Sequence, residues 1–335
     1  MLQKIWDTLA YPLTYFGSWN APLNWEKRLH VGYLLWCVVV AVAVYYASER
    51  KAGRRLWSFL FPREVYGWKA VKVDLGFVYL DRIVYLLLIV PLYEAMFRTG
   101  SWLATQGLQA SVAPRQWFWT DAQLNWAYSL GYFVVLDFAV FFPHWLQHKL
   151  PWLWEFHKVH HSATTMTPVT VYRMHPVDYV VNLGTSGLLL GLFKGSFFHL
   201  FDNANVVKVL EANIFLFLFY AVGFNLRHSH VWLSFGRAMS QVFISPAMHQ
   251  IHHSSAEKHF DKNFGFFLSI WDKLFGTLYV PQGKEQLQLG LADGTTAEYQ
   301  TVSALFWLPF KKWFALLSRR SVPQVGVGFK PTPTE

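Results

Sequence analysis

The sequence predicts an all-α integral membrane protein with about four to five membrane helices and a cytosolic histidine-rich helical cap. Three observations predict this fold class. Hydrophobic residues make up 53% of the 335 residues and aromatic residues 19%, whereas charged residues make up only 15%, against about 25% in ordinary soluble domains. Several apolar stretches approach the ~20 residues that a membrane helix needs. Eight of the fourteen histidines fall into three short clusters.

The charge and the cysteine content exclude several classes of function. The net charge is +9, and basic residues lie beside apolar stretches, where they set membrane topology and meet anionic lipid head groups. The sequence carries no nucleic-acid motif, so we expect no nucleic-acid partner. The single cysteine, Cys37, excludes disulfides within the chain, thiolate zinc sites and iron–sulfur clusters held by this chain alone.

Five apolar stretches are candidate membrane helices: residues 31–47, 75–97, 124–143, 180–200 and 207–224. The first is free of charge, and the others carry Asp81 and Arg82, then Asp137, then Lys194, then Lys208 and Glu211. The connection 201–206 is short, which predicts that the last two stretches form an antiparallel hairpin. The shorter stretches also fit buried or half-crossing helices.

Basic residues predict the orientation of these stretches. The connection after the first stretch contains Arg50, Lys51, Arg54, Arg55, Arg63, Lys69 and Lys72. We therefore expect this connection in the cytoplasm. Successive crossings then bring every histidine cluster to the same side, which predicts a multi-pass protein with its histidine clusters on the cytoplasmic face.

The chain is expected to have three parts. Residues 1–123 form an N-terminal membrane region with an interfacial segment and two spans, and residues 124–280 form the catalytic domain with the histidine clusters. Residues 281–335 hold an interfacial amphipathic helix at 303–317, interrupted by Pro309. The tail at 322–335 contains three prolines and two glycines, a composition typical of disorder.

The histidine clusters read HWLQH, HKVHH and HQIHH. Their histidines are His144 and His148; His157, His160 and His161; and His249, His252 and His253. Residues three and four apart share a helix face, so each cluster can present its imidazoles together. Neutral imidazole suits Zn, Cu, Fe and Ni. Eight imidazoles exceed the needs of one tetrahedral ion, which predicts a site for two metals.

A structural role explains single histidines but not these clusters. We interpret His30 and His199 as hydrogen-bonded structural residues. Eight imidazoles packed together without metal would leave donors and acceptors unmatched near lipid, which is costly.

Other polar residues are weaker candidates. Asp137 lies seven residues before His144 and could orient a ligand imidazole or make a helix-packing hydrogen bond. His228 and His230 form a fourth element in which one of the two is a candidate ligand, and the choice stays open. The remaining candidates for supporting or substrate contacts are His175, Asp178 and His259.

Three chemistries fit a polyhistidine metal site. Zinc hydrolysis usually needs a glutamate within HExxH, which HWLQH lacks. Transport is disfavoured because a closed, nitrogen-rich site binds metal too tightly for passage. A di-iron centre remains, acting in a dry cavity beside the bilayer where a lipid chain can reach it.

The motifs resemble those of the fatty acid hydroxylase and sterol desaturase superfamily of membrane non-haem di-iron enzymes. The resemblance covers roughly residues 130–280 and includes 137–148, 154–162 (WEFHKVHHS), 173–176 (RMHP), 245–254 (SPAMHQIHHS), 263–265 (NFG) and 271–277 (WDKLFGT). It implies a four-helix membrane core with a cytosolic cap that holds two iron ions, for which zinc can substitute in a purified protein. It also implies a further ligand ahead of the last cluster, matched here by His228 or His230.

The resemblance further implies an activity: hydroxylation or desaturation of a C–H bond of a lipid, a sterol, fatty acyl chain or related molecule, using O2 and two external electrons. The chain shows no haem-binding, flavin or nicotinamide motif. A separate ferredoxin or cytochrome with its reductase is therefore expected as electron donor. The alternative from another class is a membrane zinc-dependent hydrolase or a non-catalytic metal-binding protein.

Overall fold

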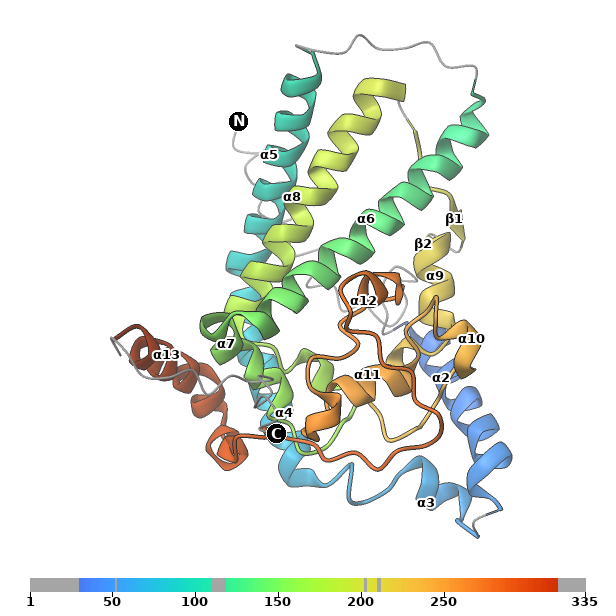
Figure 1. Ribbon diagram of the computed structural model, residues 1–335, viewed down its shortest axis with the longest axis vertical. Helices are drawn as coiled ribbons and strands as arrows, with labels where there is room; N and C mark the ends of the chain where they lie inside the picture. The colour runs from blue at the N-terminus through green and yellow to red at the C-terminus, as the bar shows by residue number, and fades with distance from the viewer. Residues whose placement is uncertain (1–29, 52, 110–118, 202–203, 210–211, 319–335) are drawn as a thin grey trace, which may run out of the picture. The chain divides into compact units, whose positions relative to one another are not determined.

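The computed structural model describes residues 30–51, 53–109, 119–201, 204–209 and 212–318 (Figure 1). Within these ranges the regular structure is helical, apart from an antiparallel pairing of β1 (Lys208–Val209) with β2 (Ala212–Asn213). The predicted all-α class is confirmed. The interfacial segment expected near the N-terminus falls largely on residues 1–29, and the tail expected at 322–335 also lies outside the described residues.

Four described helices are long and apolar enough to cross a membrane, which confirms an integral membrane protein. The first, Val31–Glu49, joins α2 (Val31–Val44) to a π-helical turn (Tyr45–Glu49). The second, Val71–Gln109, runs through α4 (Trp68–Val84), a π-helical turn (Tyr85–Ile89) and α5 (Val90–Gln109). The third and fourth are α6 (Asp121–Lys149) and α8 (Pro176–Phe201).

The fifth predicted membrane helix is absent from the described residues. The stretch 207–224 forms the β1–β2 pair and then α9 (Ile214–Ala221), a helix of only 8 residues. The Asn213 side chain caps α9 by accepting a hydrogen bond from the Phe215 N–H, which sets the helix start. At 1.5 Å per residue, α9 is about 12 Å long and cannot cross a bilayer. The expected hairpin of two membrane helices is therefore wrong.

The chain divides into two compact units that alternate along the sequence. The first unit comprises Met1–Val40, Asp81–Val140 and Tyr179–Asn225, and the second comprises Ala41–Leu80, Phe141–Asp178 and Leu226–Glu335. Each unit is thus assembled from three separate stretches. The division into residues 1–123, 124–280 and 281–335 stays a prediction.

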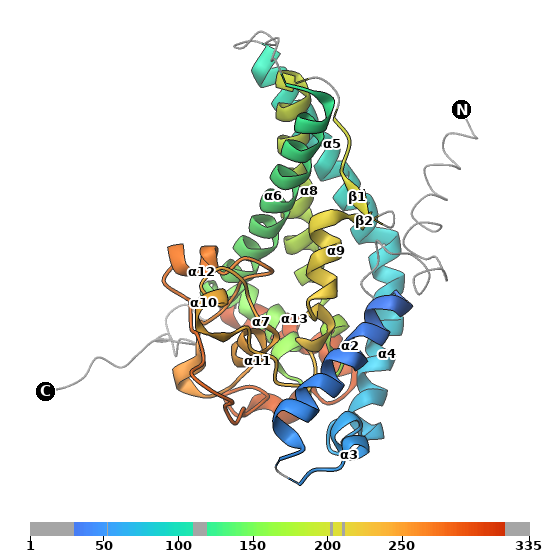
Figure 2. The same cartoon turned by 90° about the vertical axis from the view of Figure 1, so that its right-hand side faces the viewer.

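In the first unit, α5 and α8 run side by side (Figures 1 and 2) because glycines let their backbones approach. Gly187, Gly191 and Gly195 recur every four residues on one face of α8. A Cβ added at Gly191 would lie 2.0 Å from the Phe97 carbonyl oxygen, and one at Gly195 would lie 2.4 Å from that of Ser101. Such close approach of small residues stabilises helix pairs in lipid, where burial of apolar surface gives no driving force.

Helix α6 packs against α8 through aromatic side chains in the same unit. Tyr128 and Phe197 are buried with Ala204, and the Tyr128 and Phe197 ring centroids lie 5.1 Å apart. The chain after α8 returns along α6, where the Val207 N–H donates to the Ser129 hydroxyl at 2.7 Å. This bond satisfies a backbone donor beside apolar helices.

The second unit contains shorter helices and long connections. These are α3 (Leu56–Leu60), α7 (Pro151–His161), α10 (Gly236–Met239), α11 (Pro246–His252), α12 (Ile270–Leu274) and α13 (Val302–Ser318). A buried apolar cluster includes Phe77, Trp154, Val159, Tyr299 and Leu305. Helix α13 packs on α7 through this cluster and through Phe156 and Phe310, whose ring centroids lie 5.2 Å apart.

Helix α13 confirms a helix at 303–317 but not its interruption. It continues through Pro309, which is buried together with Leu305. Proline removes one backbone hydrogen bond inside a helix. The packing of this face within the second unit keeps the segment helical despite that loss.

Candidate metal centre

The second unit gathers nine histidines into two adjacent groups. The first group contains His144, His148, His157, His161 and His252. The second group contains His160, His228, His249 and His253. Each histidine contributes one ring nitrogen, and within each group these nitrogens all lie within 4.8 Å of one another. All eight histidines of the three sequence clusters are included.

Each HxxHH helix serves both groups. In α7, His157 and His161 belong to the first group and His160 to the second. The α11 segment reverses this assignment, because His252 belongs to the first group whereas His249 and His253 belong to the second. At 3.6 residues per turn, the third residue after the first lies about 60° to one side of it and the fourth about 40° to the other, so the two consecutive histidines of each unit point to different groups.

The sequence before each of these helices sets where the helix begins. Pro151 and Pro246 occupy the first turn of α7 and α11, where the missing proline N–H has no intrahelical partner to lose. At α11 the Ser245 hydroxyl accepts a hydrogen bond from the Met248 N–H at 3.3 Å. Pro151 and Pro246 therefore mark the starts of the two HxxHH helices.

The rings of the first group lie in mutual contact. The centroid of the His144 ring lies 4.6 Å from that of His252 and 4.9 Å from that of His157. The His148 ring lies 4.8 Å from both His161 and His252. Two histidines from α6, two from α7 and one from α11 thus surround a single point.

The second group is equally compact. The His253 ring centroid lies 4.6 Å from that of His160, 4.7 Å from that of His228 and 4.9 Å from that of His249. The Nε2 atoms of His228 and His249 approach to 3.0 Å. These four rings come from α7, α11 and the connection that follows α9.

Hydrogen bonds set the tautomer of four rings. The Nδ1–H of His144 donates to the Phe264 carbonyl at 3.0 Å, and that of His252 donates to the Lys262 carbonyl at 2.9 Å. His160 and His157 likewise use Nδ1, toward the Arg173 carbonyl at 3.3 Å and the Asp178 carboxylate at 3.3 Å. A proton on Nδ1 leaves the Nε2 lone pair available to a metal.

The nitrogens that face the centre fit a metal site. Among the described residues, buried Nε2 atoms lack any hydrogen-bond partner at His148, His157, His161, His252 and His253. Buried polar atoms normally have partners, and five such atoms in one place need an explanation. Convergent imidazole nitrogens are the donor set that zinc, iron and copper accept.

The surroundings keep these imidazoles neutral. Burial lowers the pKa of His157, His161, His249, His252 and His253 well below the ordinary value of 6.5, and neighbouring imidazoles lower it further. Only a neutral imidazole has a lone pair to donate to a metal. Burial therefore makes the ring nitrogens available at every physiological pH.

No carboxylate belongs to either group among the described residues. The carboxylate of Asp178, in the first turn of α8, accepts one hydrogen bond from the His157 ring and another from the Gln147 side-chain amide at 3.0 Å. Asp178 thus contacts a candidate ligand from outside the group. Such a carboxylate orients the ring and raises its basicity as a ligand.

The other candidate residues lie elsewhere. His230 has its Nε2 2.6 Å from the Phe59 carbonyl, outside both groups. His175 accepts from the Val177 N–H at Nδ1 and donates from Nε2 to the Phe306 carbonyl at 3.1 Å, so both of its nitrogens are engaged.

The last two candidates belong to neither histidine group. His259 contacts Glu285 through its Nε2 at 3.1 Å. Asp137 is buried in α6 and belongs to the first unit. Its role stays a prediction.

Two supporting residues were not predicted from the sequence. The Gln250 side-chain amide lies 3.2, 3.0 and 2.9 Å from the carbonyls of Leu226, Ser229 and Val231, and so holds the connection that carries His228. Its place inside HQIHH gave no signal, because the three carbonyls are distant in sequence. The other is Asp272, which belongs to the WDKLFGT motif and holds the loop at 263–265.

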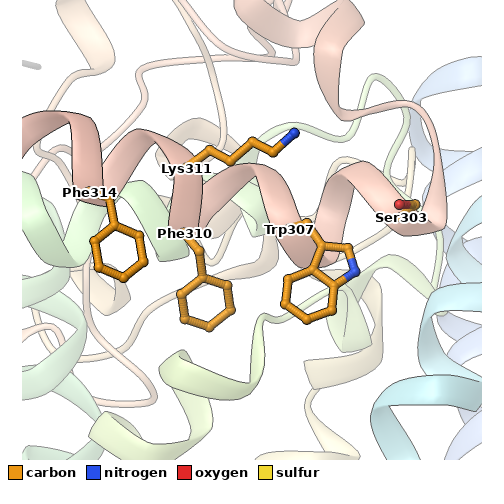
Figure 3. A pocket seen from close by; sticks show the side chains of 5 residues that line it. All are labelled: Ser303, Trp307, Phe310, Lys311 and Phe314. Carbon is orange, nitrogen blue, oxygen red and sulfur yellow. The ribbon is translucent and has the colours of Figure 1, made fainter.

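Helix α13 carries an apolar groove of about 480 Å³ lined by Ser303, Trp307, Phe310, Lys311 and Phe314. Figure 3 shows the rings of Trp307, Phe310 and Phe314 extending from one side of the helix and the Lys311 side chain extending the other way. Trp307 and Phe314 are each about 60% exposed. This groove lies on α13 and includes none of the nine histidines.

These features define an integral membrane protein with a buried polyhistidine site that could bind metal. Residues 129–277 match the model of the Fatty acid hydroxylase family, a range that includes all nine histidines. Residues 129–277 are therefore similar to the fatty acid hydroxylase and sterol desaturase superfamily, and the curated relatives support the same superfamily.

Curated relatives carry names of lipid-modifying oxidoreductases. An ornithine lipid hydroxylase from Rhizobium tropici is 25% identical over 55% of this chain and 51% of its own length. A cholesterol 25-hydroxylase from Homo sapiens is 31% identical over 43% of this chain and 48% of its own length, and one from Mus musculus is 24% identical over 83% of each. For the first of these, the chain spans about half the length of the relative. No solved structure gives a significant match.

Proposed function

We propose that this chain is a membrane-bound di-iron oxygenase that hydroxylates or desaturates a C–H bond of a lipid, with O2 and two external electrons. The observation that carries the proposal is the pair of adjacent buried histidine groups with unpartnered ring nitrogens. The names of the relatives support a lipid substrate, since they include hydroxylases, a desaturase and monooxygenases.

Each group would hold one ion. The five histidines of the first group and the four of the second would supply a nitrogen each, with His228 rather than His230 as the ligand from the connection after α9. The iron pair, when bound, supplies O2 activation and the oxidising power for the C–H bond. Neutral ligands would leave the positive charge of the ions uncompensated, which would favour the reduced state of lower charge.

The protein's own residues would orient the ligands and exclude water. Carbonyl groups and Asp178 hold Nδ1 of four rings, so the Nε2 atoms are placed before metal binds. Phe264 and Trp154 cover the first group, with ring centroids 4.9 Å from that of His148. A covered, apolar centre protects a strong oxidant from side reactions with water.

A zinc-dependent hydrolase or a non-catalytic metal-binding protein is the alternative. Hydrolysis needs a general base beside the metal-bound water. Among the described residues neither group contains a carboxylate, and Asp178 is engaged by His157 and Gln147. This arrangement favours redox chemistry.

We further propose that the histidine groups face the cytoplasm, where a ferredoxin or cytochrome with its reductase delivers electrons. Arg50, Lys51, Arg54 and Arg55 are exposed on the connection between α2 and α3. An acidic redox protein would be steered toward such a basic surface. The donor is expected to be separate because the single cysteine cannot build an iron–sulfur cluster.

Helix α13 would lie at the membrane surface. Trp307 and Phe314 are exposed on one side of α13 and Lys311 extends the other way, a pattern found in helices that rest in the head-group region. Tryptophan is favoured at this depth because its ring is apolar and its N–H is polar.

The test combines metal analysis with an oxygen-labelling assay. Full-length protein purified in detergent should contain about two iron ions per chain, and lipid extracts from cells with and without the gene should differ by one oxygen or two hydrogens. Label from ¹⁸O2 should enter any hydroxylated product. Product formation without O2 and reductant would support the hydrolase instead.

Variants tie this activity to the site. His160→Ala and His252→Ala each remove one ring from a different group, so both should abolish activity and lower bound iron. His199→Ala, at the end of α8 and outside both groups, is the matched control. Full activity with full iron content in either of the first two variants would refute the assignment.

A further inference from the structure

We propose that Asp272 is a positioning residue for the first histidine group, acting on His144 through the loop at 263–265. This inference rests on the proposed metal centre. No ligand role is assigned to Asp272, which contacts neither group directly.

Asp272 is fully buried on the short helix α12 and accepts three hydrogen bonds. Its Oδ1 accepts from the Phe264 N–H at 2.8 Å and from the Thr277 hydroxyl at 2.6 Å. Its Oδ2 accepts from the Gly265 N–H at 2.8 Å. Two consecutive backbone donors on one carboxylate leave the loop little freedom to rotate.

The loop is held on its other side by Asn263. The Asn263 amide donates to the Met248 carbonyl at 3.1 Å and to the Tyr279 carbonyl at 2.9 Å, while its Oδ1 accepts from the Tyr279 N–H at 2.8 Å. Asn263 has a φ of 59°, a left-handed conformation that asparagine tolerates better than most residues. A Cβ at Gly265 would lie 2.6 Å from Ile244 and 2.8 Å from the Asp272 Oδ2, so only glycine fits there.

Phe264, between these two anchors, contacts the first group in two ways. Its carbonyl accepts the His144 Nδ1–H at 3.0 Å and so selects the tautomer with a free Nε2. Its ring lies against His144, His148 and His252, at centroid distances of 5.6, 4.9 and 5.4 Å. A shift of the Phe264 backbone would therefore rotate one ligand and uncover two others.

The second group has a different anchor. The His160 Nδ1 lies on the Arg173 carbonyl, and the Arg173 side chain pairs with Asp74 at 2.9 Å. Loss of the Asp272 carboxylate should therefore weaken the first group and spare the second. A general structural role would weaken both groups together, which separates the two explanations.

The experiment titrates the metal-free full-length protein in detergent with Fe(II) under anaerobic conditions. Asp272→Asn is the main variant, because an amide keeps the shape but places its NH2 against one backbone N–H. Asp272→Ala removes all three acceptor contacts. Glu285→Gln is the matched control, since Glu285 also accepts from three side chains, Lys258, His259 and Tyr279, and contacts neither group.

Two backgrounds assign the loss to one group. His249→Ala leaves only the first group intact, and there Asp272→Asn should weaken Fe(II) binding about 10- to 100-fold, the usual effect of removing a group that orients a ligand. His148→Ala leaves only the second group intact, and there the same substitution should leave the affinity unchanged. Asp272→Ala alone should reduce bound iron from about two ions to one.

Three results would overturn the inference. If Asp272→Asn in the His249→Ala background bound Fe(II) as tightly as His249→Ala alone, the hydrogen bonds between Asp272 and the loop at 263–265 would not position His144. Equal weakening in both backgrounds, or in Glu285→Gln, would show a general loss of structure. Wild-type protein that binds no iron would instead refute the proposed metal centre itself.

Discussion

The rings of His161 and His253 stack on one another, with centroids 4.5 Å apart and ring planes 23° from parallel. The two residues belong to different groups and are separated by more than ninety positions in the sequence. Their contact joins the two groups side by side. Ions bound in the two groups would therefore be neighbours, as the proposed di-iron centre requires.

The two histidines of the connection after α9 should behave differently. His228→Ala removes a member of the second group and should lower bound iron to about one ion per chain, with loss of activity. His230→Ala removes the contact with the Phe59 carbonyl and the ring contacts with Phe59 and Tyr66 but no member of either group, so it should keep both ions and cost about 1 kcal/mol of stability for the lost hydrogen bond. Metal analysis and thermal unfolding of both variants check this, and the reverse metal contents would assign His230 as the ligand.

Asp178 should affect metal affinity without being a ligand. Asp178→Asn leaves an amide NH2 facing either the His157 Nδ1–H or the Gln147 amide, so one hydrogen bond is lost. We expect iron binding by the first group to weaken about 10- to 100-fold. Asp293→Asn, which changes a half-buried carboxylate bonded to Thr295, serves as the control. Unchanged affinity in Asp178→Asn would contradict the orienting role.

Gln250 should control the second group through the backbone. Gln250→Leu keeps a similar size but leaves the carbonyls of Leu226, Ser229 and Val231 without this donor. The expected cost is about 1–3 kcal/mol of stability, because a buried acceptor loses its partner. The second group should also bind iron more weakly, because His228 lies within the released segment. If Gln250→Leu bound iron with unchanged affinity in the His148→Ala background, Gln250 would not control the second group.

The pH dependence of unfolding should report His175. Burial lowers its pKa from the ordinary value of 6.5 to about 4, while the hydrogen bond to Phe306 opposes that shift. The unfolded chain therefore binds a proton between pH 6.5 and 4 that the folded protein does not. Stability is full above pH 6.5 and falls as the pH drops toward 4, by about 3 kcal/mol at ~1.4 kcal/mol per pH unit.

The variant His175→Gln isolates this contribution. Its unfolding midpoint should fall less steeply than that of the wild-type protein as the metal-free forms are acidified from pH 6.5 to 4. Both proteins carry the same other histidines, so the difference in slope belongs to His175. If the unfolding midpoints of both proteins fell equally with pH, His175 would take up its proton in the folded state as it does in the unfolded chain.

The exposed face of α13 can be tested with a single label. The chain has one cysteine, Cys37, which is buried, so Cys37→Ala gives a background for Trp307→Cys with an environment-sensitive fluorophore. In vesicles containing anionic lipid, quenchers carried on the lipid should reduce its emission. The control label at Lys258→Cys, on an exposed side chain outside α13, should respond to aqueous iodide instead. Iodide quenching at both positions would exclude membrane contact of α13.

The local properties of this protein could be predicted from its sequence. Apolar runs predicted the four candidate membrane helices, because their length and hydropathy are properties of contiguous residues. The HxxHH spacing predicted which imidazoles share a helix face, since that depends only on helix periodicity. Pro246 likewise marked the start of α11. The resemblance of the same motifs then indicated the family.

The way in which distant segments combine became visible only in the folded protein. The fold divided each HxxHH unit between two groups, selected His228 over His230 as the ring beside His253, and shortened the fifth apolar stretch to α9. It also brought Asp272 and Gln250 to the loops that carry or contact histidines of the two groups. These outcomes depend on contacts between residues far apart in sequence, and helical periodicity carries no information about which faces of two separate helices will meet.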